Sequence, residues 1–359
     1  MSSATTFASP AVFKSALDRR VRAHFGARNT ADSAAMYVKA AVLLCASAAS
    51  YTLLVFRDNG FLVTAAAIVT LALALTGIGF NIQHDGNHGG FSRRRWVNRA
   101  AGFTLDLIGA SSYFWKDKHN HNHHVFTNIP HEDADIDLGG LARLSDGDEW
   151  RWFHRYQHLY LWVLYAFVHL RYLYSDPQRL LLGKNDGLTV GYPAGRELAA
   201  LLAGKAVFLA LAFVIPLTQH AWPSVVGGFV LVSMIMGVIF SVVFQLAHTV
   251  DIVEHPSVHD DRMRAEWSVH QVRTTANFAT SNRWLTMALG GLNFQREHHL
   301  FPRIAHVHYP AIAHLVREVC DEQGVAYCEN RTVGMALRSH YRFVRHMGTR
   351  PVVAAASSS

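Results

Sequence analysis

The stretch "PSVVGGFVLVSMIMGVIFSVVFQL" (223–246) decides the fold, because it contains no charged residue. About 20 consecutive apolar residues are enough for a helix to cross the hydrocarbon core of a bilayer. Similar stretches occupy 33–56, 61–80 and 198–217. All four are apolar on every face, whereas the helices of a soluble bundle would each keep a polar face. The sequence therefore predicts four transmembrane helices.

Short connections arrange these spans in two pairs. "RDNG" (57–60) separates the first two stretches, and "TQHAWP" (218–223) connects the last two. The predicted fold is an all-α integral membrane protein with four transmembrane helices in two hairpins. We expect a cytoplasmic N-terminal segment at 1–32, a membrane domain at 33–340, and a C-terminal tail at 341–359 with a disordered end.

The basic residues predict the orientation of the spans. Segment 1–32 holds five Lys or Arg, 81–197 holds thirteen and 247–359 holds twelve, whereas the two hairpin loops together hold one. By the positive-inside rule, both termini and the middle segment are cytoplasmic. The basic residues form no single patch interleaved with aromatic residues, so we expect no nucleic-acid partner. No cleavable signal peptide is recognisable, and we expect the membrane helices themselves to direct insertion.

Two further segments have an amphipathic character. The segment 156–174 ("YQHLYLWVLYAFVHLRYLY") is rich in Tyr and His, and 101–115 is short. Both favour interfacial helices, with aromatic rings at the depth of the headgroups. If 156–174 crossed the membrane instead, everything after it would change sides.

Three histidine clusters stand out among the 23 histidines. They are "HDGNH" (84–88), "HNHNHHVFTN" (119–128) and "QREHH" (295–299), and His248 and His270 lie between the last two. With four spans, all of these residues fall on the same side, in a histidine-rich cytoplasmic cap. Nine isolated histidines are expected to be ordinary interfacial or surface residues: His154, His158, His169, His220, His306, His308, His314, His340 and His346.

Clusters of imidazole at a membrane face indicate a metal site. Histidine at membrane depth rarely lacks a functional partner, and imidazole without thiolate suits iron, zinc, copper or nickel. The cysteines Cys45, Cys320 and Cys328 have no zinc or iron–sulfur spacing. A zinc ion takes about four ligands, whereas eight histidines are available here, so two metal ions are predicted. The eight are His84, His88, His119, His123, His124, His248, His298 and His299.

Helix geometry predicts the relative positions of only some of these eight histidines. His84 and His88, four residues apart, lie on one face of a helix. At 100° per residue, His123 and His124 share an arc with His119 or with His121 almost equally well. The choice between His119 and His121 therefore stays open on geometry alone.

The three clusters, in this order and separated by paired spans, resemble the histidine boxes of the membrane fatty acid desaturases. The resemblance covers residues 75 to 330. It is closest to bacterial front-end acyl-lipid or acyl-CoA desaturases, whose third box begins with Gln and continues "HHLFP", as in 295–302. The segments "TNIPHEDADID" (127–137) and "HQVRTTANF" (270–278) are similar to that group too.

The resemblance implies a non-heme di-iron centre that uses O2 to introduce a cis double bond into an acyl chain, in a bacterial inner membrane. It implies iron binding by the eight histidines above, His119 included, with no catalytic side chain beyond the ligands. Further residues are expected behind the ligands or as possible ligands: Gln295, His270, His121 and Asp85. The carboxylates of 132–137 either hold ligand histidines or form a solvated acidic loop.

Two expectations concern partners. Many front-end desaturases carry a fused cytochrome b5 domain with an HPGG motif, which is not found in this sequence. We therefore expect a separate ferredoxin or cytochrome b5-like electron donor with its reductase. Arg93, Arg94 and Arg95 contact a phosphate of CoA or of a lipid headgroup, or they only anchor the chain at the cytoplasmic face.

Other functions remain as alternatives. A hydroxylase or ketolase of the same membrane di-iron superfamily uses similar boxes, and Δ9 is the alternative to a Δ6-like position. A metalloprotease would use "HDGNH" in place of HExxH, but it leaves two clusters unexplained. A haem-binding electron carrier or a metal transporter would place its polar residues within the spans. Chain length and the choice between acyl-CoA and acyl-lipid are not determined by the sequence.

Overall fold

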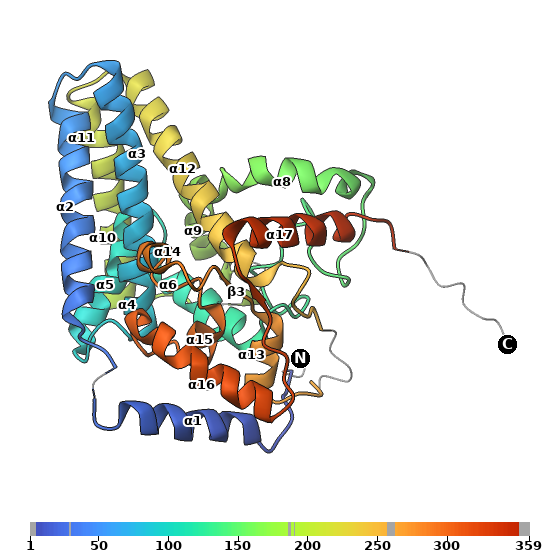
Figure 1. The fold of residues 1–359 in the computed structure, drawn as a ribbon. Helices are drawn as coiled ribbons and strands as arrows, with labels where there is room; N and C mark the ends of the chain where they lie inside the picture. The colour runs from blue at the N-terminus through green and yellow to red at the C-terminus, as the bar shows by residue number, and fades with distance from the viewer. Residues whose placement is uncertain (1–4, 29, 186–187, 190, 257–262, 352–359) are drawn as a thin grey trace.

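A computed structural model describes residues 5–28, 30–185, 188–189, 191–256 and 263–351. Within these residues, four helical segments are long and apolar enough to cross a membrane: Ala34–Phe56, Phe61–His88, Arg196–Leu217 and Trp222–His248. They form two hairpins that pack side by side as an elongated bundle (Figure 1). The predicted membrane fold with two hairpins is confirmed.

The second span is longer than the sequence predicted. Helix α3 (Phe61–Ile78) continues through a π-helical turn, η1 (Gly79–Gln83), into α4 (His84–His88). The helical rod continues past the expected end at residue 80 and stops at Gly89, which adopts a left-handed conformation with φ of 78°. The first histidine pair thus stands on the same rod as the membrane span.

The second hairpin has a similar construction. Helix α10 (Arg196–Leu209) continues through η4 (Ala210–Val214) into α11 (Ile215–Leu217). After a short turn, α12 (Trp222–His248) runs back and ends on His248. The first hairpin begins with α2 (Ala34–Phe56), which packs along α3.

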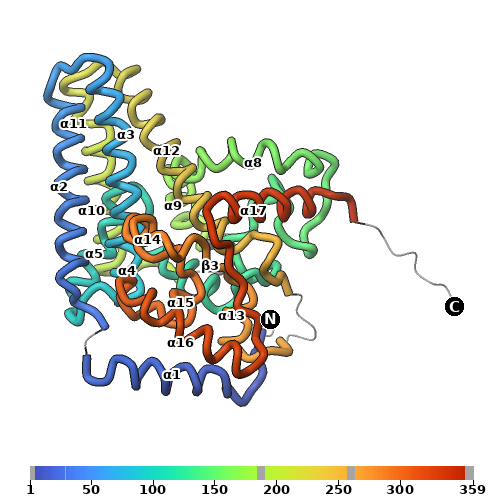
Figure 2. The backbone as a smooth tube through the Cα atoms, viewed as in Figure 1, coloured from blue at the N-terminus to red at the C-terminus, as the bar shows by residue number. Residues whose placement is uncertain are grey.

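A cap of shorter helices covers one end of the bundle (Figures 1 and 2). Helix α1 (Val12–Phe25) packs on α16 (Tyr309–Glu322) through a core that includes Leu17, Ile312 and Val316. The predicted N-terminal segment is therefore largely a packed part of the cap. The other helices of this side are α13 (Trp267–Thr274), α14 (Arg283–Ala288), α15 (Gln295–Leu300) and η5 (His306–His308).

The middle segment forms short helices against the bundle. They are α5 (Arg95–Leu107), α6 (Ser112–Lys116), η2 (Asp117–His123), α7 (His124–Phe126), η3 (Trp152–Tyr156), α8 (Gln157–Tyr165) and α9 (Val168–Leu182). The segment 156–174 is thus divided between α8 and α9, of 9 and 15 residues. Both are shorter than the ~20 residues of a spanning helix, which favours the interfacial interpretation.

The predicted boundary at residue 340 falls inside a helix. Helix α17 (Val333–Met347) buries Phe343, Val344 and Met347 against Leu161 and Tyr165 of α8. This apolar face keeps the chain packed beyond the expected start of the tail. The predicted disordered end, at 352–359, lies outside the described residues.

The strands in the described part of the chain are pairs of two residues each. β1 (Lys184–Asn185) pairs antiparallel with β2 (Leu188–Thr189), and β3 (Asn277–Phe278) pairs parallel with β4 (Glu329–Asn330). The second pair joins the segment before α14 to the segment before α17. The architecture is otherwise helical, as the sequence predicts.

Close packing at Gly86 yields a test of this architecture. A Cβ atom added to Gly86 would lie 2.6 Å from the backbone nitrogen of Gly102 on α5. We expect Gly86→Ala to destabilise the protein by about 1–3 kcal/mol, because overpacking forces α4 and α5 apart. Gly227→Ala is the matched control, since nothing lies within 4 Å of a Cβ added on that exposed side of α12. Thermal unfolding in detergent measures both, and equal melting temperatures would contradict the packing argument.

Candidate metal centre

The second histidine cluster folds as a π-helix, η2 (Asp117–His123), and not as the α-helix assumed above. A π-helix bonds residues five apart, and such turns are frequent at functional sites. His119 and His124 are five apart, and their Nε2 atoms lie 3.1 Å from each other. His121 points away, with its side chain 74% exposed and its Nδ1 3.6 Å from Asp117. The structure thereby separates His119 from His121, which helix geometry alone did not.

All eight predicted ligands come together in one buried cluster. Each is at most 8% exposed. They come from the end of the α3–α4 rod, from η2 and α7, from the last residue of α12 and from α15. The groups with ligand atoms within 4.8 Å of one another are His84–His88–His119–His298, His123–His248–His299, His124–His298–His299 and His119–His123–Asp135. Residues more than 200 positions apart therefore converge at one end of the bundle.

The ring nitrogens of this cluster fit metal binding. Within the described residues, the Nε2 atoms of His88, His123, His298 and His299 are buried without a hydrogen-bond partner. Both ring nitrogens of His84 are in the same state. Most buried polar side-chain atoms in proteins have a hydrogen-bond partner. Several unpaired imidazole nitrogens facing one another are the arrangement that a bound metal would satisfy.

Hydrogen bonds on the outer side of the rings orient these nitrogens. The Nδ1 of His298 lies 3.1 Å from the Tyr309 hydroxyl, and the Nδ1 of His299 lies 2.8 Å from Oε1 of Gln271. The Nδ1 of His123 lies 3.1 Å from both carboxylate oxygens of Asp133. A ring that donates through Nδ1–H keeps its Nε2 lone pair for a metal. Asp133 is therefore a supporting residue and does not belong to a solvated loop.

Burial keeps most of these imidazoles neutral. It lowers the pKa of His119 to about 3 and lowers the pKa of His124, His298 and His299 well below the usual value. Burial alone would also lower the pKa of His123, but the charges of Asp133 and Asp135 raise it above its usual value. Neutral imidazole is the form that binds metal.

Asp85 lies behind His84 and holds a histidine that the sequence analysis missed. Its carboxylate accepts hydrogen bonds from the backbone N–H of His306 at 3.2 Å and from Nδ1 at 2.9 Å. It also lies 3.7 Å from Nδ1 of His84. Lys39 of α2 contacts Nε2 of His306 at 2.8 Å. His306 is outside the three boxes, so no local signal distinguished it.

Gln295 and His270 differ in their surroundings. The Gln295 amide lies 2.9 Å from Nε2 of His248, a predicted ligand. His270 is buried, and burial lowers its pKa to about 4. It packs on Phe7 with ring centroids 5.2 Å apart and belongs to none of the metal-type groups found among the described residues.

The remaining residues lie outside the cluster. Arg93, Arg94 and Arg95 are exposed, and Nε of Arg93 lies 3.9 Å from Asp32. Several isolated histidines expected at a surface are buried in the fold instead. His154 bonds the carbonyl of Gly140, His169 that of Ile108, and His340 the hydroxyl of Tyr165. These rings satisfy polar groups inside helix contacts, so they are not surface residues, and neither is His306.

A buried cluster of imidazoles at the end of a four-helix membrane bundle defines a class of membrane protein equipped to bind metal. Comparison with known proteins gives the family. The family model described as fatty acid desaturase matches residues 59–331. The chain therefore belongs to the fatty acid desaturase family and is an oxidoreductase, which decides against the protease, electron-carrier and transporter alternatives.

Individual relatives cover nearly the whole chain. It is 38% identical to an sn-1 linoleoyl-lipid 6-desaturase of Arthrospira platensis, over 97% of this chain and 96% of that protein. It is 34% identical to a protein of the same description from Synechocystis sp., over 94% and 95% of the two chains. An acyl-lipid (8-3)-desaturase of Physcomitrium patens is 33% identical over 87% of this chain and 66% of its own length.

The contrast between His119 and His121 gives a matched test of the site. We expect His119→Ala to lower the bound metal of the purified protein severalfold, because it removes a buried ring nitrogen from the cluster. His121→Ala should keep the wild-type metal content, since that side chain is exposed. Metal analysis of both variants decides, and equal losses would contradict the proposed division of roles.

Proposed function

We propose that this protein is an O2-dependent front-end acyl-lipid desaturase that introduces a cis double bond at the Δ6 position. The observation that carries the proposal is the similarity over almost the full chain to two linoleoyl-lipid 6-desaturases, together with the buried histidine cluster. The relatives favour an acyl-lipid over an acyl-CoA substrate. They also favour Δ6 over Δ9.

We propose two iron ions for the histidine cluster. His84, His88, His119 and His298 would hold one iron, and His123, His248 and His299 the other. His124 groups with His298 and His299 and so stands between the two sets. An all-imidazole set without thiolate is compatible with iron, and the desaturase family supports that choice of metal.

When bound, the iron pair supplies the oxidising power that dehydrogenates a methylene pair with O2. The overall reaction takes two hydrogens from the acyl chain and two electrons and two protons from outside, and it forms two molecules of water. The protein's own residues position the acyl chain and exclude water from the site. A cavity of about 170 Å³ adjoins His119, His123 and His248, and Phe240 and Phe244 form part of its wall. Charged side chains such as Lys118, Asp135 and Arg171 also line this cavity, so the two phenylalanines would hold a methylene group beside the ligands on its apolar side.

The supporting residues keep the ligand rings fixed during that reaction. Asp133, Gln271 and Tyr309 hold the outer nitrogens of His123, His299 and His298. Such partners fix the tautomer and the ring plane of a ligand histidine. We propose the same role for Gln295 toward His248, whereas Asp85, held by His306, would act on His84 through its charge at 3.7 Å from Nδ1.

We propose that the cluster and both termini lie on the cytoplasmic side of a bacterial cell membrane. The basic residues of the loops support that orientation. The two electrons would come from a separate ferredoxin or cytochrome b5-like carrier and its reductase. Arg93, Arg94 and Arg95, exposed beside the α4 end of the span, suit contact with lipid phosphate.

Expression in a bacterial host that lacks Δ6 fatty acids tests the function. Fed with linoleate, cells that produce the wild-type protein should accumulate an acyl chain with a new double bond at the sixth carbon, located by mass spectrometry of suitable derivatives. A hydroxylated product without a new double bond would favour the hydroxylase alternative, and a double bond at another position would contradict the assigned regiochemistry.

The matched controls use one predicted ligand and one exposed histidine. We expect His299→Ala to abolish the product, because a di-iron site that has lost a ligand cannot hold its metal in place. His121→Ala should retain wild-type levels. Product from the His299→Ala variant at wild-type levels would contradict the ligand role.

A further inference from the structure

Helix α17 has a strongly basic outer side. The segment 331–350, which includes this helix, holds five arginines and no acidic residue. Three of the five, Arg338, Arg342 and Arg345, are exposed on α17 itself. At 100° per residue they lie within an arc of about 60°. We call these three side chains the arginine stripe.

The opposite side of α17 is buried in the fold. Phe343, Val344 and Met347 pack against α8, and Ala336 belongs to the core around α12. By helix geometry these residues point away from the arginine stripe. The stripe is therefore the free side of a helix whose other side is held by its neighbours.

Helix α8 shows on which side of α17 the membrane lies. Leu161 and Tyr165 of α8 contact α17, whereas Leu159 and Val163, on the other side of α8, are 60% and 61% exposed. Exposed apolar side chains on an interfacial helix are those that enter the lipid. In Figure 1, α8 lies above α17, on the side toward which the four spans extend. The arginine stripe thus points away from the bilayer, which disfavours a role as an anchor to lipid headgroups.

The inner side of α17 is attached to the residues that follow a predicted ligand. Nδ1 of His340 lies 2.7 Å from the carbonyl oxygen of Thr249, the residue directly after His248. The backbone N–H of Asp251 donates a hydrogen bond to the Ser339 hydroxyl at 3.2 Å. A helix with its side chains is about 10–12 Å in diameter. Little more than the thickness of one helix therefore separates the arginine stripe from the end of α12.

The stripe keeps most of its positive charge. Nη1 of Arg342 lies 3.5 Å from Oδ2 of Asp251, and the Arg342 side chain is still 63% exposed. Exposed ion pairs of this kind stabilise a fold by only about 0–1 kcal/mol. An acidic partner can therefore compete with Asp251 for this guanidinium group.

The basic residues of α1 form a less suitable surface. Arg19 and Arg22 are exposed, but Arg20 pairs with Glu318 and Glu322 of α16, so the charges on this side are mixed. Helix α1 also packs on α16, which in turn contacts the ligand-bearing helix α15. A partner on α1 would be separated from the histidine cluster by two helices.

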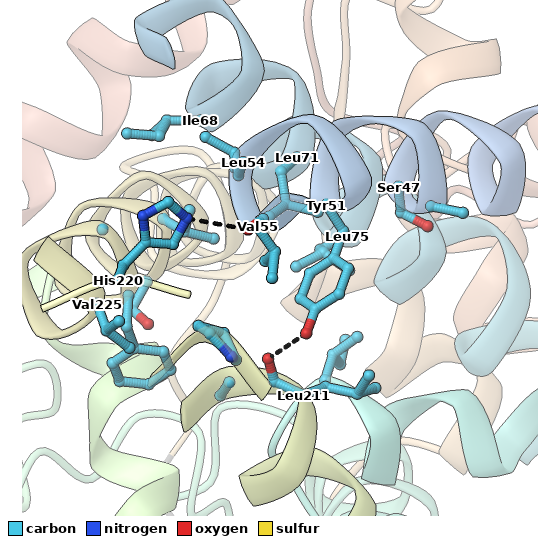
Figure 3. A pocket seen from close by; sticks show the side chains of 18 of the residues that line it. Ser47, Tyr51, Leu54, Val55, Ile68, Leu71, Leu75, Leu211, His220 and Val225 are labelled. Atoms are coloured by element: carbon cyan, nitrogen blue, oxygen red, sulfur yellow. Dashed lines mark hydrogen bonds between the residues drawn. The ribbon is translucent and has the colours of Figure 1, made fainter. Parts of the chain in front are cut away.

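The end of the bundle near the hairpin loops is unsuitable for a different reason. A cavity of about 740 Å³ lies there between the two hairpins, and side chains such as Leu54, Ile68 and Val225 form its wall (Figure 3). Among the described residues that line it, the charged side chains are one cation and one anion, Arg57 and Asp58. This end carries no excess of positive charge.

We propose that the arginine stripe of α17 is the docking surface for the electron carrier, a small acidic redox protein. This inference rests on the proposed function. Each docking oxidises the carrier by one electron and reduces the metal centre by one, and two dockings supply the two electrons that the desaturation consumes. Complementary charges speed the encounter and orient the partner. Electron transfer slows steeply with distance, so a surface one helix away from His248 suits this role.

Removal of the stripe tests the proposal by a binding measurement. The stripe variant, Arg338→Gln/Arg342→Gln/Arg345→Gln, is placed in nanodiscs of neutral lipid. Surface plasmon resonance then measures the affinity of a plant-type ferredoxin and of a soluble cytochrome b5. We expect the carrier that binds the wild-type protein to bind the variant about tenfold more weakly at low salt, because three interface charges are lost. High salt should reduce this difference, since it screens exposed charges. Failure of both carriers to bind the wild type overturns the proposal.

A control variant removes the same charge elsewhere on the cap. Arg19→Gln/Arg22→Gln/Arg28→Gln replaces three exposed arginines on or next to α1. This variant should bind the carrier like the wild type. Equal losses in both variants, or a loss only in the control, overturn the assignment to α17.

Folding of the variants is checked by melting temperature and metal content, which should match the wild type because the replaced side chains are exposed and lie outside the histidine cluster. If the stripe variant unfolds, the single substitutions Arg338→Gln and Arg345→Gln take its place. Each should weaken binding about twofold, as expected for one exposed charge. Wild-type affinity in both single variants overturns the proposal.

Product analysis separates this inference from the proposed function. In the host described above, co-expressed with the carrier, the stripe variant should form product more slowly than the wild type and with the same double-bond position. A wild-type protein that forms no double bond refutes the proposed function. Normal product from the wild type, combined with wild-type carrier affinity in the stripe variant, refutes only the docking surface.

Discussion

The convergence of unpaired imidazole nitrogens is the constraint on which the rest of the structure depends. Each of these rings is buried and, by its pKa or by its hydrogen bonds, is held with a lone pair available. Without a partner, every such nitrogen costs about 1–3 kcal/mol of desolvation free energy. Among the described residues, eight such ring nitrogens are gathered in this one cluster. The ends of two membrane spans, a π-helical segment and α15 are brought there together, and a bound metal would repay the cost.

Rigid helices determine where those nitrogens lie. The α3–α4 rod and α12 carry their histidines at the end of uninterrupted spans, so the bilayer that orients the spans also fixes His84, His88 and His248. Close contacts add precision: a Cβ at Gly237 would lie 2.6 Å from the carbonyl of Ala166, which leaves little freedom between α12 and the α8–α9 segment. The cluster is thereby built on elements that cannot move independently.

Much of this could be predicted from the sequence, because spans and histidine boxes are local signals. The four spans and the eight clustered histidines follow from composition, spacing and family resemblance. Asp85 was expected behind the ligands, but its contact with His306 could not be predicted, since these two residues are 221 positions apart and meet only through packing. The burial of His119 in place of His121 depends on a π-helix, for which the sequence carries no clear periodicity.

Charge explains why carboxylates lie around the outside of this imidazole cluster, in contact with its rings. In the proposed di-iron site, neutral imidazole ligands would leave the charge of two cations uncompensated, and a low-dielectric site near a membrane would make that unfavourable. Asp133 contacts His123, Asp85 lies behind His84, and Asp135 lies 3.9 Å from Nδ1 of His119. Asp133 and Asp85 thus place negative charge behind the rings, and Asp135 forms a further metal-type group with His119 and His123. In the proposed function, carboxylates behind the rings would balance the metal charge and leave the inner side of the cluster to O2 and the acyl chain.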